Sequence, residues 1–351
     1  MTIRILAAGD HFVQNSLLID AIERQNPGAA SFSELTLPWP VTPFGRVAEV
    51  DEASGTEEEL IEALQGVAVC ATQMAPLTET VLSQCPDLLL FSIGRGGPVN
   101  ANVEAATRHG VAVTYAPGRN STATAEHTVA MMLAAARRIP ATHSDLLGGQ
   151  WRGDYYMYDS VGPELDGSTV GLVGYGAIGR KVARILTGFG ARVLVHDPYV
   201  TQEVLGDSAR LVGLPELLGS SRIVSLHARV TAETTGMIGA EEIAAMPRGS
   251  ILVNCARGAL LDYEAALDGL ESGRLFGAAF DVFPEEPIPS DSRLLTTPGV
   301  VMTPHLAGSS RETAHNAASI IAGEIGRHLR GEPLKYCANP DVFATGHRIT
   351  R

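Results

Sequence analysis

Three polar segments in the second half of the chain carry side chains that can bind or protonate a small acid. Arg257, the acids of residues 281–286 and His305 each follow a short apolar run of strand type. An arginine can hold a carboxylate with two hydrogen bonds and polarise a neighbouring carbonyl. A histidine exchanges protons near neutral pH. Singly, each has an ordinary explanation: a solvated ion pair, an acidic loop or a histidine in a turn. Their joint placement at three strand ends favours a functional site that binds a carboxylate and transfers a proton.

A glycine-rich turn in the middle of the chain favours dinucleotide binding. The apolar run 170–173 leads into Gly-Tyr-Gly-Ala-Ile-Gly at 174–179, and a helical pattern follows. Three glycines at this spacing allow a tight turn, a close approach of a pyrophosphate and close packing of helix on strand. The pattern alone is weak, because any tight turn selects glycine. However, Asp197 ends the next predicted strand, where a carboxylate accepts hydrogen bonds from an adenosine ribose.

An alternation of short apolar strands and helical patterns must position these groups, and it predicts an α/β fold with parallel sheets. We expect strands over 3–7, 47–50, 67–70, 88–92, 111–115, 169–173, 191–196, 222–227, 250–254, 276–281 and 299–302. We expect helices over 13–24, 57–64, 78–83, 102–109, 121–147 and 310–330. Three prolines in residues 35–45 predict an irregular excursion there. Two doubly wound sheets therefore follow one another along the chain, and substrate and cofactor are expected to meet in the cleft between them.

Composition narrows the possible partners. A formal charge of −13 argues against nucleic-acid binding, which needs a basic face. No apolar run approaches the roughly eighteen residues of a membrane span, and the N-terminus enters a strand without the features of a secretory leader. The four cysteines show neither paired nor metal-binding spacing, so we expect reduced thiols, no metal and a cytoplasmic protein.

These segments together resemble the D-isomer-specific 2-hydroxyacid dehydrogenase family, in its phosphoglycerate dehydrogenase-like branch. The resemblance runs from about Leu88 to Asn339, and it rests on four motifs: 174–179, Asn-Cys-Ala-Arg-Gly at 254–258, Asp-Val-Phe-Pro-Glu-Glu-Pro at 281–287 and Thr-Pro-His at 303–305. It implies two doubly wound domains, Rossmann-like and flavodoxin-like. The NAD-binding domain, residues 118–308, would be inserted into a discontinuous substrate domain of residues 1–117 and 309–351.

The resemblance also implies a reaction. Arg257 would bind the substrate carboxylate and polarise its carbonyl, and His305 would be the acid/base with Glu286 as its partner. Glu286 matches rather than its neighbour because it immediately precedes Pro287. The reaction would be hydride transfer between NAD and a D-2-hydroxy acid, which becomes a 2-oxo acid.

Further residues are implied at the cofactor. They are Gly174, Tyr175, Gly176, Ala177, Ile178 and Gly179 at the pyrophosphate turn; Asp197 at the ribose; His227, Ala228, Arg229 and Thr234 on the adenosine side; and Cys255, Ala256, Arg257, Asp281, His305 and Ala307 towards the nicotinamide. The family usually has proline where Arg229 stands. With Asp197 present a 2′-phosphate would meet a like charge, so NAD is expected rather than NADP.

On the substrate side the resemblance implies a small-residue loop, with the backbone amides of Gly96 and Gly97 holding the carboxylate. Asn120 resembles a substrate-facing asparagine of formate dehydrogenases, but those enzymes have glutamine at the position of Glu286, which argues against formate. Arg95 departs from the family pattern. We expect it to bind a second anionic group of the substrate, and the alternative is an arginine paired with a nearby acid.

The resemblance makes helix 121–147 a dimerisation helix, so a homodimer is expected. The aromatic loop 151–158 follows it, and its tyrosines are expected to pack at an interface rather than enter the partner's site. Because the sequence ends soon after residue 330, we expect it to lack the regulatory domain of many phosphoglycerate dehydrogenases.

Two other functions remain open on the sequence. One is an NAD(H)-sensing interaction protein, like the corepressor relatives that keep this fold; no disordered tail supports it. The other is phosphite oxidation on the same scaffold. The motifs do not identify the acid.

Overall fold

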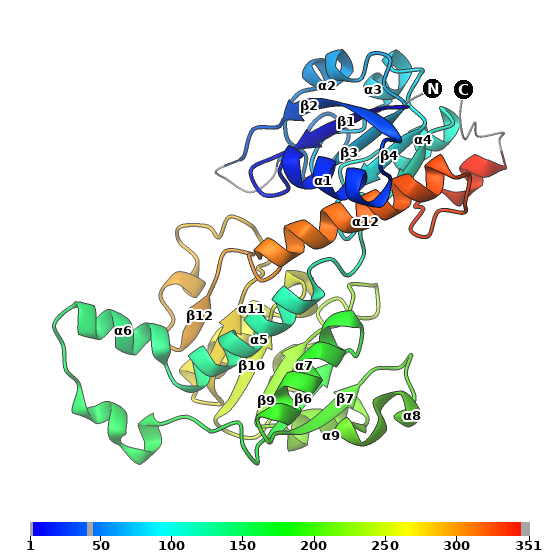
Figure 1. Cartoon of the computed structure of the whole chain (residues 1–351). Helices are drawn as coiled ribbons and strands as arrows, with labels where there is room; N and C mark the ends of the chain where they lie inside the picture. The colour runs from blue at the N-terminus through cyan, green and yellow to red at the C-terminus, as the bar shows by residue number, and fades with distance from the viewer. Residues whose placement is uncertain (1–2, 41–44, 345–351) are drawn as a thin grey trace. The chain divides into compact units, whose positions relative to one another are not determined.

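The computed structural model describes residues 3–40 and 45–344. They form two compact units, each with its own parallel sheet (Figure 1). The described residues up to Asn120, together with those from Ser310 onward, make the first unit, and Ser121–Ser309 make the second. The predicted α/β class with doubly wound parallel sheets is confirmed.

The first unit is a five-stranded sheet in the order β2-β1-β3-β4-β5, and every strand pair in it is parallel. The strands are β1 (Ile3–Gly9), β2 (Ala30–Thr36), β3 (Val69–Thr72), β4 (Leu90–Ile93) and β5 (Ala112–Thr114). One face is covered by α1 (Asn15–Gln25) and α12 (Arg311–Leu329), and the other by α2 (Glu57–Ala63), α3 (Glu79–Gln84) and α4 (Val103–Arg108). The strand order reverses direction between β1 and β3, which is where doubly wound sheets bind ligands.

One predicted strand of the first unit is wrong, and one strand of its sheet was not predicted. Residues 47–50 form no strand in the sheet; Val47 and Val50 only bridge to each other, around Ala48 at φ 49°. The edge strand β2 was missed, because Ala-Ser-Phe-Ser-Glu-Leu-Thr is partly exposed and has few apolar residues. The predicted excursion 35–45 begins inside β2, and its residues 41–44 lie outside the described residues.

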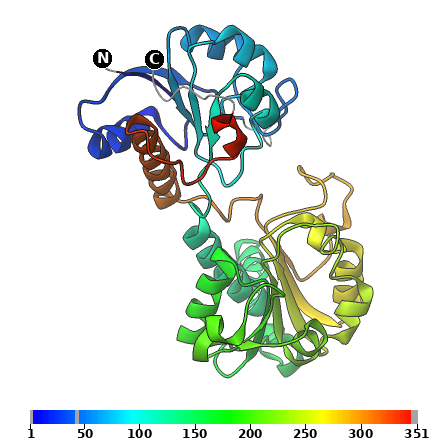
Figure 2. The ribbon, with the colours of Figure 1, turned by 90° about the vertical axis from the view of Figure 1, so that its right-hand side faces the viewer.

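The second unit is a seven-stranded sheet in the order β12-β11-β10-β9-β6-β7-β8, again with every pair parallel. The strands are β6 (Thr169–Val173), β7 (Arg192–His196), β8 (Arg210–Leu211), β9 (Ile223–Leu226), β10 (Ser250–Asn254), β11 (Leu275–Phe280) and β12 (Val300–Met302). The two-residue β8 was not predicted. Figure 2 shows helices on both faces of this sheet.

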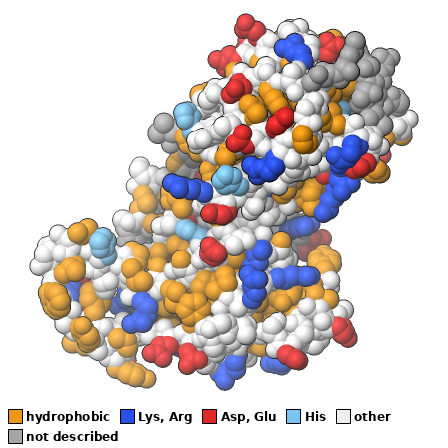
Figure 3. Space-filling view, in the orientation of Figure 1, with side chains coloured by type: hydrophobic (Ala, Val, Ile, Leu, Met, Phe, Trp, Pro, Cys, Tyr) orange, Lys and Arg blue, Asp and Glu red, His pale blue; other side chains and the backbone are white. Residues whose placement is uncertain are grey.

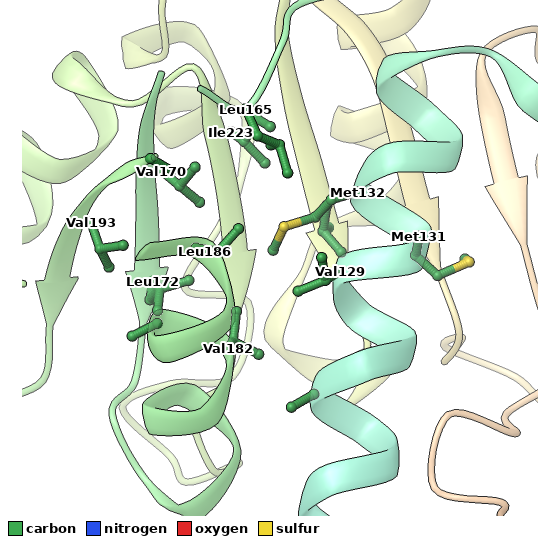
Figure 4. Close-up of a cluster of buried hydrophobic side chains, with 14 of the residues drawn as sticks. Val129, Met131, Met132, Leu165, Val170, Leu172, Val182, Leu186, Val193 and Ile223 are labelled. Atoms are coloured by element: carbon green, nitrogen blue, oxygen red, sulfur yellow. The ribbon is translucent and has the colours of Figure 1, made fainter. Parts of the chain in front are cut away.

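Apolar side chains fill both faces of the second sheet. One face packs against α5 (Ser121–Ala136) and α7 (Ala177–Gly188), where Val129 and Met132 point towards Leu186 (Figure 4). The other packs against α9 (Leu214–Ser220), α10 (Ala240–Ala245) and α11 (Tyr263–Glu271). Within residues 3–40 and 45–344, the remaining helical segments are α8 (Gln202–Leu205) and six short 3₁₀ turns: Gly153–Tyr156, Tyr158–Ser160, Gly206–Ser208, Gly258–Leu260, Arg293–Leu295 and Pro340–Phe343.

The predicted single helix 121–147 is broken in two. After α5 ends, Arg138 takes a left-handed conformation at φ 51°, and α6 (Ile139–Leu147) begins. Pro140 explains the break, since it has no N–H to donate to the carbonyl of Ala136 and its ring would clash with that group. The two pieces differ in burial. Nine residues of α5 are buried, whereas α6 has no buried residue.

Two further findings concern expectations from composition. Among the described residues, no helix is both long enough and apolar enough to cross a bilayer. All four cysteines are free thiols, and three of them are buried.

The segment after α12 is anchored to the edge of the first sheet by Asn339. Its buried side chain accepts from Val113 N at 2.9 Å and donates to Val111 O at 2.9 Å and Thr107 Oγ1 at 3.1 Å. We expect Asn339→Ala to lower the free energy of unfolding by about 2–4 kcal/mol, because two buried backbone groups lose their partners. Denaturant unfolding measures this. Asn316→Ala, which removes one exposed hydrogen bond, is the control at less than about 1 kcal/mol; equal losses would contradict the assignment.

Candidate functional site

The glycine turn after β6 is shaped by close backbone packing. Gly174 lies at φ 106°, and a Cβ there would sit 2.7 Å from the carbonyl carbon of His227. A Cβ on Gly179 would sit 2.3 Å from Gly174 O. Gly176 is different: it is exposed, and a Cβ there would meet nothing within 4 Å. Gly174 and Gly179 thus allow the close backbone packing of the turn, and Gly176 leaves space in which a ligand can approach the backbone.

The N-terminus of α7 faces the same open space. The helix starts at Ala177 directly after Gly176, and no side chain caps it. The first amides of a helix have no acceptor within the helix, and the helix dipole makes this end positive. Ala177 is exposed and Ile178 half-buried. This arrangement fits the pyrophosphate of a dinucleotide.

Asp197 lies beside that turn. Its Oδ2 accepts from Tyr175 N at 2.7 Å, and its Oδ1 accepts from Tyr199 N at 2.9 Å. The carboxylate is therefore fixed at the end of β7, next to the turn. A negative group there suits the hydroxyls of a ribose and repels a 2′-phosphate.

The loop after β9 approaches the glycine turn from the other side. His227 N donates to Val173 O at 2.7 Å, and the imidazole Nε2 lies 3.0 Å from Ser225 Oγ. Burial lowers the pKa of His227 to about 4, so the ring is neutral at neutral pH. Ala228 is half-buried beside it and Arg229 is exposed. Thr234 Oγ1 donates to Arg229 O at 2.6 Å, which closes the loop.

The turn after β10, which carries Arg257, is built by Asn254. The buried side chain of Asn254 accepts from Ala256 N at 3.1 Å and donates to Arg257 O at 2.9 Å. The Arg257 side chain is exposed, and one of its terminal nitrogens donates to Ala256 O at 2.7 Å. Cys255 is buried, which raises the pKa of its thiol to about 12 and keeps it protonated.

A second set of contacts locks the β10 turn to the segment after β11. Tyr263 Oη accepts from Asn254 Nδ2 at 3.2 Å and donates to Val282 O at 2.5 Å. Gly258 lies so close to this segment that a Cβ would be 2.1 Å from Phe283 O. The positions of the Arg257 and Glu286 segments are therefore coupled.

The structure joins His305 and Glu286 directly. His305 Nδ1 lies 2.7 Å from Glu286 Oε2, and Glu286 Oε1 accepts from Phe283 N at 2.9 Å. About half of the His305 side chain is exposed. With Nδ1 engaged by the carboxylate, Nε2 is the ring nitrogen left to exchange a proton with another molecule.

The loop that carries His305 is held by Asp281. This carboxylate is 1% exposed and accepts from Thr303 Oγ1 at 2.6 Å, Leu306 N at 2.9 Å and Ala307 N at 2.8 Å. We predicted Asp281 at the nicotinamide and Ala307 beside the cofactor; in the structure the two bond to each other. His305 itself takes a left-handed φ of 50°, which is strained for a residue with a side chain.

Several residues that support the site were not predicted. Asn254, Tyr263 and Thr303 support the site through the hydrogen bonds described above, which hold the loops that carry Arg257, Glu286 and His305. His127 of α5 lies 2.9 Å from Thr303 Oγ1 through its Nε2. His127 lies directly before the apolar part of α5, which was a usable signal for this contact, whereas the sequence offered no such signal for the others.

The predicted substrate residues belong to the first unit. Arg95 forms an ion pair with Glu52, and its carbonyl accepts from Ala116 N at 2.7 Å. The ordinary alternative for Arg95, a nearby acid, is thus present. Gly96 and Gly97 have open space where a Cβ would lie, and Asn120 is half-buried at the end of the unit.

Residues 129–307 match the family model described as D-isomer specific 2-hydroxyacid dehydrogenase, NAD binding domain. The chain is 38% identical over 297 residues to a D-3-phosphoglycerate dehydrogenase of Methanocaldococcus jannaschii, covering 84% of this chain and 56% of the relative. It is 35% identical over 294 residues to a glyoxylate reductase of Korarchaeum cryptofilum, covering 83% of this chain and 89% of the relative. The chain spans about half the length of the phosphoglycerate dehydrogenases that it matches.

Solved structures agree with the fold. A protein of Thermus thermophilus superposes with a TM-score of 0.76 at 29% identity, covering 96% of this chain and all of that chain. A D-lactate dehydrogenase of Treponema pallidum gives 0.79 at 25% identity, covering 96% of this chain and 100% of the other.

The glycine turn can be tested by two substitutions with opposite effects. Gly174→Ala places a side chain on a residue that must keep a positive φ, and its Cβ would clash with the backbone of His227. We therefore expect it to lower the free energy of unfolding by about 2–4 kcal/mol. Gly176→Ala meets no protein atom, so stability should hold while its Cβ fills the space before α7 and weakens NADH binding about tenfold or more. Unfolding curves and NADH titration measure the two effects. Unchanged NADH affinity in Gly176→Ala would contradict the assignment.

Proposed function

The chain belongs to the D-isomer-specific 2-hydroxyacid dehydrogenase family, and on that premise we propose that it is an NAD-dependent enzyme that interconverts a D-2-hydroxy acid and its 2-oxo acid. The observation that carries the proposal is the His305–Glu286 pair at 2.7 Å, because it supplies an oriented proton donor and acceptor. NAD, when bound, accepts or supplies the hydride of the reaction. The protein then has to bind the acid, polarise its carbonyl and move one proton.

His305 would move that proton. In oxidation its Nε2 takes the hydroxyl proton of the substrate, and in reduction it returns a proton to the carbonyl oxygen. Glu286 holds Nδ1 and so fixes the ring orientation and tautomer, and it stabilises the imidazolium that forms. The hydrogen bond from Phe283 N in turn fixes Glu286.

Arg257 would bind the substrate carboxylate and polarise the carbonyl. Its guanidinium is exposed at the end of β10, on the strand next to β11, which leads to Glu286. We assign the backbone amides of Gly96 and Gly97, with Asn120, to the substrate carboxylate, and Arg95 to a second anionic group. These four residues are supported by the resemblance and by their open or half-buried positions in the first unit.

The second unit has a fitting place for the cofactor. Gly176 with the amides of Ala177 and Ile178 would hold the pyrophosphate, and Asp197 the ribose, which favours NAD over NADP. The loop from His227 to Thr234 would lie on the adenosine side. Cys255, Ala256, Asp281 and Ala307 would lie towards the nicotinamide, with the thiol of Cys255 protonated.

We assign homodimerisation to α6 and the loop that follows it. Large apolar side chains are exposed there, among them Leu147 at 77%, Trp151 at 84% and Tyr158 at 90%. Figure 3 shows apolar side chains gathered over this part of the second unit. An exposed apolar patch of this kind favours an interface. The proposed interface is therefore the second half of the predicted helix 121–147, because the first half, α5, packs within its own unit. A cytoplasmic location is part of the same proposal and rests on the free cysteines.

The proposal is tested by NADH oxidation against a panel of 2-oxo acids, with phosphite and NAD as a further assay. We expect His305→Gln to lower kcat about 10²- to 10⁴-fold, since it removes the acid/base, while the Kd for NADH changes less than about threefold. The control is His315→Gln on α12, which should leave both unchanged. Equal loss of turnover and of NADH affinity would contradict the role of His305. NADH binding by the wild-type chain without turnover of any acid would favour the sensor instead.

The dimer assignment predicts that charge at the patch separates the subunits. The double variant Leu147→Asp, Trp151→Asp should be a monomer by light scattering after size-exclusion chromatography, because two carboxylates would be buried against apolar surface. Tyr199→Asp, at another exposed aromatic of the second unit, should keep the mass of the wild type. A dimeric double variant would place the interface elsewhere.

A further inference from the structure

A guanidinium in the first unit has fewer partners than its burial requires. Arg119 follows β5, and its terminal nitrogen donates to Gln73 Oε1 at 3.0 Å. Its Nε is buried and has no acceptor among the described residues. A buried charged donor without an acceptor costs free energy, so such a group often marks a place where a ligand completes the hydrogen bonding.

The position of Arg119 is the second observation. Asp10 follows β1, Gln73 follows β3, Arg95 follows β4 and Arg119 follows β5. These strands are consecutive in the sheet, so all four side chains start from its carboxyl-terminal edge. The reversal of strand order between β1 and β3 lies at the same edge, where doubly wound sheets bind ligands.

The backbone ties Arg95 and Arg119 together. Ala116 N donates to Arg95 O at 2.7 Å, and Arg119 N donates to Ala116 O at 3.5 Å. Burial and the nearby charge of Arg95 lower the pKa of Arg119 to about 10, against the opposite effect of Asp10, so the Arg119 guanidinium is still charged at neutral pH.

Neither nearby acid accepts a hydrogen bond from the Arg119 side chain among the described residues. Asp10 accepts from Phe12 N at 2.7 Å, Val13 N at 2.8 Å and Gln73 Nε2 at 3.2 Å. Its charge attracts Arg119, but the hydrogen bonds that join the two residues run through the Gln73 amide. Glu52 pairs with Arg95 and is the more exposed partner, at 46% against 15%. The direct hydrogen-bond partner of Arg119 is therefore neutral, and the acid on Arg95 lies towards solvent.

We infer that Arg119, together with Arg95, recognises a second anionic group on the substrate, and that Glu52 is the counterion which this group displaces. A carboxylate or phosphate would give the Nε of Arg119 an acceptor and take the place of Glu52 on Arg95. The substrate would then be a dianionic 2-oxo acid. This inference rests on the proposed function for the reacting end of the molecule, but the anion site itself does not depend on it.

The alternative is a purely structural Arg119, which holds Gln73 and lies with its guanidinium carbon 5.9 Å from the centroid of the Phe12 ring. Steady-state kinetics with 2-oxoglutarate, which has a second carboxylate, and 2-oxobutyrate, which does not, separate the two roles. We expect Arg119→Gln to lower kcat/KM about 10- to 100-fold for 2-oxoglutarate and less than about threefold for 2-oxobutyrate. Arg108→Gln, an exposed arginine paired with Glu79, is the matched control and should change neither. Equal loss with both substrates would overturn the inference.

A binding experiment without turnover tests the site directly. Inorganic phosphate is titrated into the full chain by calorimetry. Arg119→Gln should weaken its binding about tenfold or more, and Glu52→Gln should tighten it several-fold by removing the competing carboxylate. If Arg119 had only a structural role, Glu52→Gln would not bind phosphate more tightly than the wild type. Equal phosphate affinity in wild type, Arg119→Gln and Glu52→Gln, or no binding to Glu52→Gln, would overturn the inference even for an active enzyme. If phosphate binds in the expected order of affinity but the chain turns over no 2-oxo acid, the proposed function is overturned and the anion site stands.

Discussion

The rest of the site depends on the hydrogen bonds that the buried carboxylate of Asp281 accepts. It gathers Thr303, Leu306 and Ala307 around one negative group, and the loop between them presents His305. The positive φ of His305 costs free energy that an isolated loop could not hold. Three hydrogen bonds to a buried charge stabilise that conformation. The acid/base geometry is therefore set by an anchor placed at the end of the neighbouring strand, in addition to the His305–Glu286 contact itself.

The same principle applies along the edge of the second sheet. Asn254 ends β10 and folds the turn that carries Arg257, while Tyr263 connects that turn to the segment after β11. The backbone of Gly258 lies so close to Phe283 that no side chain fits between the two segments. Buried polar side chains thus fix the backbone, and the exposed side chains of Arg257 and His305 project from it. Rigid support of this kind lowers the cost of ordering the reacting groups.

The sequence predicted most where a residue type reports directly on local geometry. The glycines at 174–179 predicted the turn because φ 106° at Gly174 and the contact at Gly179 admit no side chain. The strand ends at Arg257, at the acids of residues 281–286 and at His305 followed from the apolar runs before them, and the family motif selected Glu286. Local patterns failed where tertiary context decides. Partly exposed β2 lacked an apolar signal, and the partners of Arg95 and Asp281 are distant in sequence. The break between α5 and α6 is different, because Pro140 is a local signal for it that the predicted helix 121–147 did not take into account.

The division of the chain between the two units sets an order on folding during synthesis. The second unit is one continuous stretch, Ser121–Ser309, and all of it precedes the last helix, α12, in the chain. The first unit must wait, because α12 covers the face of its sheet formed by Ile5, Val69 and Leu90. Domains generally fold as units once their residues are available. The segment that is translated first is thus the one that completes its core last, and until then it exposes an apolar sheet face for chaperones to protect.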